Sequence, residues 1–151
     1  VDAMVLGGHG DNMVPLPQYT TVSGIPVSEF LPKETIDRLV TRTIDAGAEI
    51  VSLLKEGSAF YAPSAAIVAM VDAIINDSAR VIPTSVYLEG EYGFSDVCMG
   101  VPAKLGKNGV EKVIEIDLSP EQVAALSISE KAVRSGIEKL DLRVYEKAFV
   151  V

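Results

Sequence analysis

Two segments of the chain carry apolar residues with the periodicity of helices. After Pro32, apolar residues recur every three or four positions, and this spacing predicts a helix over residues 33–56 that Gly57 ends or kinks. The next run, AAIVAMVDAII, is apolar on nearly every side, so we expect a deeply buried helix that starts near residues 62–64, with Pro63 in its first turn. The stripe on the first helix consists of Ile36, Leu39, Val40, Thr43, Ile44, Ala48, Val51 and Leu54.

Alternation of apolar and polar residues predicts strands in the rest of the chain. Residues 2–7 are expected to form a strand that runs into a glycine turn, and residues 15–31 carry two short β-type pieces broken by proline and glycine. Residues 79–93 and 96–118 alternate with a period of two. Within the latter range, the segment KNG predicts a hairpin turn between VPAKL and VEKVIEI. We therefore expect an antiparallel β unit in the second half.

The start of a last helix has the clearest local signal. Ser119 is expected to be its N-cap and Pro120 its first residue, with Glu121 and Gln122 in the first turn. The sequence contains no internal repeat, low-complexity tract or linker. These elements predict one α+β unit.

Composition and charge narrow the possible functions. With 13 basic and 21 acidic residues, the formal charge of −8 lacks the basic footprint of nucleic-acid binding. The first residues lack the pattern of a signal peptide, and no apolar stretch approaches the roughly 20 residues of a membrane span. A single cysteine, Cys98, excludes an intrachain disulfide and a thiol pair for zinc or redox chemistry. We therefore expect a cytoplasmic protein with no nucleic-acid or membrane partner.

The only histidine, His9, lies in the segment GGHGD. A lone histidine in a soluble domain is more often a surface or structural residue than a catalytic one. Here Gly7, Gly8 and Gly10 remove the side chains around it, which leaves room for a ligand. Metal binding is disfavoured because His9 and Asp11 are only two candidate ligands, and no serine lies in the G-x-S-x-G elbow of many hydrolases.

Three segments carry a resemblance to a known family. In order, GGHGDNMVPL, PKETIDRLVTRTIDAGAEIVSLLKEGSAFYAPSAA and VPAKLGKNGVEKVIEIDLSPEQ closely resemble the C-terminal substrate domain of malate dehydrogenases of the lactate-dehydrogenase-like type. The resemblance covers residues 1–140 and leaves residues 141–151 as a C-terminal tail. It implies an α+β fold with long helices packed on antiparallel strands. It also implies an NAD-dependent oxidoreductase of the tricarboxylic acid cycle that interconverts malate and oxaloacetate.

The resemblance implies a role for His9 as the catalytic acid and base. A neutral imidazole would take the hydroxyl proton of malate as hydride leaves, and a protonated one would donate to the carbonyl of oxaloacetate. Asp11 belongs to the same motif but is not thereby the carboxylate that orients the ring. In the family, that carboxylate comes from a segment upstream of this chain.

The resemblance also implies substrate and cofactor contacts. Gly8, Ser58 and Ala59 would bind the substrate, because the small side chains in GSAFYAP leave room for the second carboxylate of a dicarboxylic acid. Pro63 and Met13 would contact the nicotinamide of NAD. An ordinary helix break with ordinary packing explains GSAFYAP equally well.

The chain also departs from the complete family pattern. It has no G-x-G-x-x-G fingerprint after a strand, so we expect an N-terminal Rossmann half in a longer polypeptide or a partner chain, and an inactive chain without it. The resemblance implies a homodimer or homotetramer. Two alternatives stay open: half of an L-lactate dehydrogenase, or a non-catalytic assembly or folding module. The arginines that match none of the family's substrate-clamping positions are Arg38, Arg42, Arg80, Arg134 and Arg143.

Overall fold

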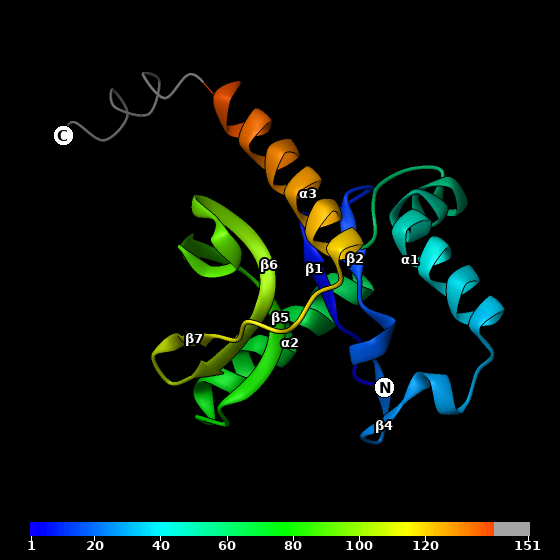
Figure 1. Ribbon diagram of the computed structural model, residues 1–151, viewed down its shortest axis with the longest axis horizontal. Helices are drawn as coiled ribbons and strands as arrows, with labels where there is room; N and C mark the ends of the chain where they lie inside the picture. Colours follow the sequence, from blue (N-terminus) through cyan, green and yellow to red (C-terminus); the bar gives the residue numbers. More distant parts are fainter. Residues whose placement is uncertain (141–151) are drawn as a thin grey trace.

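The computed structural model describes residues 1–140, which form an antiparallel sheet and three long helices (Figure 1). The predicted α+β class is confirmed. The tail predicted at residues 141–151 lies outside the described residues. The helices are α1 (Lys33–Leu54), α2 (Tyr61–Ile75) and α3 (Pro120–Glu138). The sheet strands are β1 (Val5–Gly7), β2 (Met13–Pro15), β5 (Arg80–Glu89), β6 (Ser95–Gly106) and β7 (Gly109–Val113).

The sheet is built around β6. Strand β6 pairs with β5 in a long antiparallel ladder, with β7 through the following hairpin, and with β1, which pairs in turn with β2. The hairpin predicted at KNG is confirmed, because Gly106 pairs with Gly109 across Lys107 and Asn108. Gly109 has a φ of +85°, a conformation that glycine adopts without strain.

The N-terminal segments are shorter than predicted. Strand β1 begins only at Val5, and Asp2 makes an isolated bridge with Thr21. The two β-type pieces expected between residues 15 and 31 are reduced to β3 (Thr21–Val22) and β4 (Ile25–Pro26), which pair with each other. Prolines interrupt this stretch and remove backbone donors, which keeps the strands short. Short 3₁₀ turns occupy Pro17–Tyr19 and Val27–Glu29.

The main core lies between the sheet and α3. The alternation along β6 places Val97, Met99 and Val101 on one face, each with at most 1% of its surface exposed. Leu126 of α3 packs into the same cluster. Figure 1 shows α3 crossing the sheet. The cluster consists of Leu6, Val14, Leu16, Leu88, Val97, Met99, Val101 and Leu126.

Helices α1 and α2 lie where the sequence predicts them, but α2 is not deeply buried. Its only buried residue is Ala73, whereas 67% of Val68 and 75% of Ile75 are exposed. The expectation of deep burial is wrong for this chain because its own elements do not surround α2, which packs mainly on β6. Within residues 1–140, no helix is long and apolar enough to cross a membrane.

The predicted start of α3 is confirmed in detail. Ser119 Oγ accepts a hydrogen bond from the Gln122 N–H at 3.3 Å, and Gln122 Oε1 accepts one from the Ser119 N–H at 3.0 Å. Pro120 occupies the first helical position. Hydrogen bonds from its own backbone N–H and from the Ser119 side chain lower the pKa of the Glu121 carboxyl group. This capping box fixes where α3 begins relative to the sheet.

We predict that Ser119→Ala lowers the free energy of unfolding by about 1 kcal/mol, because it leaves a donor at the start of α3 without its acceptor. Urea unfolding followed by circular dichroism measures the change. Ser127→Ala is the matched control, since its hydroxyl donates only to the Val123 carbonyl within the same helix. Equal stability of the two variants would contradict the role of the cap.

Candidate active site

His9 lies in the turn that joins β1 to β2. The turn begins after Gly7, which pairs with Met13 in the hairpin and has a φ of +91°. Gly10 follows His9 with a φ of +121°, and its carbonyl accepts a hydrogen bond from the Met13 N–H at 3.0 Å. L side chains rarely adopt such angles, so glycine is needed on both sides of the histidine.

The backbone leading into His9 is held between β6 and α3. A Cβ atom on Gly7 would lie 2.6 Å from Ser129 Oγ, and one on Gly100 would lie 2.6 Å from the Gly7 carbonyl oxygen. The Gly8 N–H donates a hydrogen bond of 2.7 Å to Ser129 Oγ, and Ser129 is fully buried. We call these residues the glycine–serine contact: Gly7, Gly8, Gly100 and Ser129.

A cavity of about 400 Å³ opens beside the turn. Gly8, His9 and Met13 line it, together with residues of β5, β6 and α3. The His9 side chain is exposed and Met13 is half-buried, so a ligand can reach the imidazole. The strand and helix residues of the lining include Pro83, Thr84, Ser85, Cys98, Gly100 and Val133.

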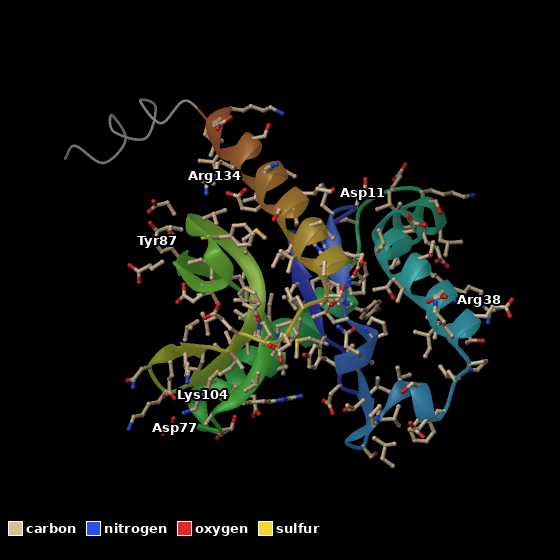
Figure 2. The ribbon with its side chains drawn as sticks, viewed as in Figure 1. Asp11, Arg38, Asp77, Tyr87, Lys104 and Arg134 are labelled. Carbon is tan, nitrogen blue, oxygen red and sulfur yellow. The ribbon has the colours of Figure 1, made fainter. Side chains whose placement is uncertain are left out.

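The other predicted site residues lie after α1. Ser58 and Ala59 belong to the connection between α1 and α2, and Pro63 is in the first turn of α2. Ser58 and Pro63 are exposed, Ala59 is half-buried, and none of the three lines the His9 cavity. In the view of Figure 1, this connection passes the outer end of the β1–β2 hairpin, where Figure 2 shows Asp11.

The electrostatic surroundings of His9 are sparse. Within residues 1–140, its imidazole has no hydrogen-bond partner, and the cavity is lined by no Asp, Glu, Lys or Arg. Arg42 pairs with Glu49 at 2.8 Å, and Arg134 pairs with Glu130 at 2.6 Å. In the same part of the chain, no group of three His, Cys, Asp or Glu residues could hold a metal ion.

The residues of the cavity fit only one end of a dinucleotide. Apart from His9, the lining is apolar or carries hydroxyl and thiol groups, which suits an aromatic ring and offers no cation to a phosphate group. In Rossmann folds, a pyrophosphate is bound by a glycine-rich turn at the start of a helix. The Gly7–Gly10 turn instead joins two strands of a hairpin.

Ser129 and Gly100 were not predicted from the sequence. Ser129 had a detectable signal, because it follows Leu126 by three positions and precedes Val133 by four, and so lies on the buried face of α3. A polar residue on such a face needs a hydrogen-bond partner. Gly100 carried no comparable local signal, since its role depends on the approach of another strand.

The family described as lactate/malate dehydrogenase, alpha/beta C-terminal domain, matches residues 1–142, and the chain belongs to this family. Malate dehydrogenase of Methanosarcina mazei is 62% identical over 142 residues, which are 94% of this chain and 46% of that protein. Malate dehydrogenase of Roseiflexus sp. is 57% identical over 140 residues, 93% of this chain and 45% of that protein.

Solved structures of both family branches share this fold. Malate dehydrogenase from Salinibacter ruber superimposes with a TM-score of 0.87 at 48% identity, covering 95% of this chain and 47% of that one. Lactate dehydrogenase from Eimeria maxima, solved with NADH and oxamate, gives 0.85 at 36% identity, covering 99% and 47%. This chain therefore spans about half the length of the curated relatives and solved structures it matches.

We predict that Gly7→Ala destabilises the protein more than Gly10→Ala, by roughly 1–3 kcal/mol. Both substitutions place a side chain at a positive φ, but only the new methyl group at position 7 meets Ser129 Oγ, whereas no atom lies within 4 Å of a Cβ at position 10. Thermal unfolding of the two variants measures the difference. Equal melting temperatures would show that the close approach at Gly7 contributes nothing.

Proposed function

We propose that this chain is the catalytic, substrate-binding half of an NAD-dependent malate dehydrogenase and that His9 is its proton donor and acceptor. The observation that carries the proposal is the exposed imidazole on a glycine-flanked turn beside a cavity, in a chain 62% identical to a malate dehydrogenase. Glycines keep the space in front of the ring open for substrate.

The chemistry assigned to His9 is a single proton transfer. The neutral imidazole accepts the hydroxyl proton of malate, and the protonated form donates to the carbonyl oxygen of oxaloacetate. When bound, the nicotinamide of NAD supplies or accepts the hydride. Histidine suits this role because it is the side chain that ordinarily changes charge between about pH 5 and 8.

The remaining site residues are assigned by the same proposal. Gly8, Ser58 and Ala59 contact the substrate, and their small size leaves space for its second carboxylate. Met13 and Pro63 contact the nicotinamide. Met13 already lines the cavity beside His9. Ser58, Ala59 and Pro63 lie outside that cavity, so their roles require the substrate to extend toward the α1–α2 connection.

An N-terminal Rossmann half completes the site in this proposal. Three observations support it: the chain spans about half the length of its relatives, no Asp, Glu, Lys or Arg lines the cavity, and the imidazole lacks a hydrogen-bond partner within residues 1–140. A dicarboxylate needs cationic partners, and a catalytic imidazole needs a group that orients it. We assign both to the other half.

A homodimer or homotetramer in the cytoplasm is the proposed state of the complete protein. Apolar side chains on α1 and α2 are exposed in this chain, and apolar area of this extent is normally covered by another domain or subunit. The single cysteine suits a reducing compartment. The exposed side chains include Leu39, Val51, Leu53, Leu54, Ile67, Val68, Val71 and Ile75.

The main alternative is half of a lactate dehydrogenase, since solved lactate dehydrogenases share the fold at 36% identity and above. Malate is favoured because eight curated relatives with 49–62% identity are named malate dehydrogenase. The second alternative is a non-catalytic assembly module. Comparing kcat/KM for oxaloacetate and pyruvate in the complete protein separates the two substrates, and lack of turnover with either supports the module.

We predict that His9→Asn in the complete protein lowers kcat for oxaloacetate reduction by about 10²- to 10⁴-fold, the usual worth of general acid–base catalysis. NADH affinity stays nearly unchanged, because the substitution removes the proton donor and not the cofactor site. Asn12→Ala, an exposed change in the same turn, is the control. Near-normal turnover of a folded His9→Asn variant would refute the assignment.

We also predict that the 151-residue chain alone neither binds NADH measurably nor reduces oxaloacetate, and that adding the N-terminal half restores both. Holding the two reactants together is worth roughly 7–11 kcal/mol of barrier, and this chain lacks the groups that bind the cofactor phosphates. NADH fluorescence titration and NADH absorbance with oxaloacetate test the two parts. Sustained turnover by the chain alone, abolished by His9→Asn, would contradict a divided site.

A further inference from the structure

We propose that Ser129 is a positioning residue for His9, which it holds in place through the Gly8 N–H. The proposal rests on the function assigned to His9 above. Ser129 lies on α3, 121 positions from Gly8 in the sequence, yet its Oγ accepts the Gly8 hydrogen bond at 2.7 Å. Gly8 directly precedes His9, so this hydrogen bond fixes the backbone next to the histidine.

The turn needs such an anchor because its own sequence provides little rigidity. Glycines occupy both sides of His9, and glycine has more backbone freedom than any other residue. The Met13 N–H closes the turn onto the Gly10 carbonyl, but this bond is local and moves with the hairpin. The ladder pairing of Gly7 with Gly100 links the start of the turn to β6, and the hydrogen bond to Ser129 links the turn to α3.

Ser129 is well suited to act as a fixed point. It is fully buried, and Leu126, one helical turn earlier on the same face, packs in the core with 2% of its surface exposed. On the opposite side, Gly100 of β6 leaves only enough room for the Gly7 carbonyl. The glycine–serine contact therefore restrains the entry to the turn from both the helix and the sheet.

The size of Ser129 matters as well as its hydroxyl group. A Cβ on Gly8 would lie 3.3 Å from Val133 Cγ2 and 3.4 Å from Ser129 Oγ, so the turn already packs tightly against α3. Alanine fits this space and removes only the acceptor. The freed turn can then shift, and a misplacement of about 1 Å can cost roughly 100-fold in rate.

The kinetic test uses the complete protein. We expect Ser129→Ala to lower kcat for oxaloacetate about 10- to 100-fold while KM for NADH changes less than roughly twofold. Leu126→Val, which weakens the packing of α3 without touching the hydrogen bond, keeps kcat within about threefold at an equal or larger loss of melting temperature. In the His9→Asn background, Ser129→Ala causes no further loss, because the two residues act as one unit.

A second measurement does not depend on activity. Hydrogen exchange of the Gly8 amide, followed by NMR in the complete protein, should be at least about tenfold faster in Ser129→Ala. The ring signals of His9, assigned by their loss in His9→Asn, should shift in Ser129→Ala and not in Ser127→Ala. These results support the link even if the wild-type protein does not reduce oxaloacetate, an outcome that would refute only the proposed function.

The proposal is overturned by any of three results. Unchanged Gly8 exchange and His9 ring signals in Ser129→Ala would show that the hydrogen bond does not hold the turn. An equal fall in kcat for Leu126→Val would reduce Ser129 to a stability residue. A further fall on adding Ser129→Ala to His9→Asn would show that it acts independently of His9.

Discussion

The close approach of three backbone segments at Gly7 is the constraint on which the site depends. The Gly7 carbonyl oxygen of β1 lies only 2.6 Å from where a Cβ at position 100 would be. The Ser129 hydroxyl of α3 lies 2.6 Å from where a Cβ at position 7 would be. Only residues with little or no side chain allow the β1–β2 hairpin, β6 and α3 to meet here. Since His9 lies two residues beyond this point, the packing of the whole domain determines where its backbone lies.

The buried cluster fills the space between the sheet and α3, while α1 has no fully buried residue and α2 has one. A cavity of about 340 Å³ lined by apolar residues remains between α1 and the N-terminal strands. The chain therefore supports the histidine turn through its core and leaves apolar side chains of α1 and α2 exposed, which fits a domain that spans about half the length of its relatives.

Local signals in the sequence predicted the elements and failed where distant contacts decide. The cap at Ser119, the turn at Gly109 and the helix that ends near Gly57 depend on neighbouring residues, and all three are found as expected. The burial of α2 could not be predicted, because an apolar helix reveals that it needs cover but not which chain provides it. The link between Ser129 and Gly8 spans 121 positions and was equally invisible.

The structure also separates two aspects of the positioning of His9. Within residues 1–140, hydrogen bonds hold the backbone on either side of His9, and none holds its ring. The location of the Cα is therefore set by this domain, whereas the rotation of the imidazole is left to groups elsewhere, in our proposal the N-terminal half. In that proposal, proton transfer depends on assembly, because the ring adopts its working orientation only when the N-terminal half is in place. In the same proposal, His9 of the separate domain is accessible but not oriented for proton transfer, so the domain does not act on substrate until the N-terminal half joins it.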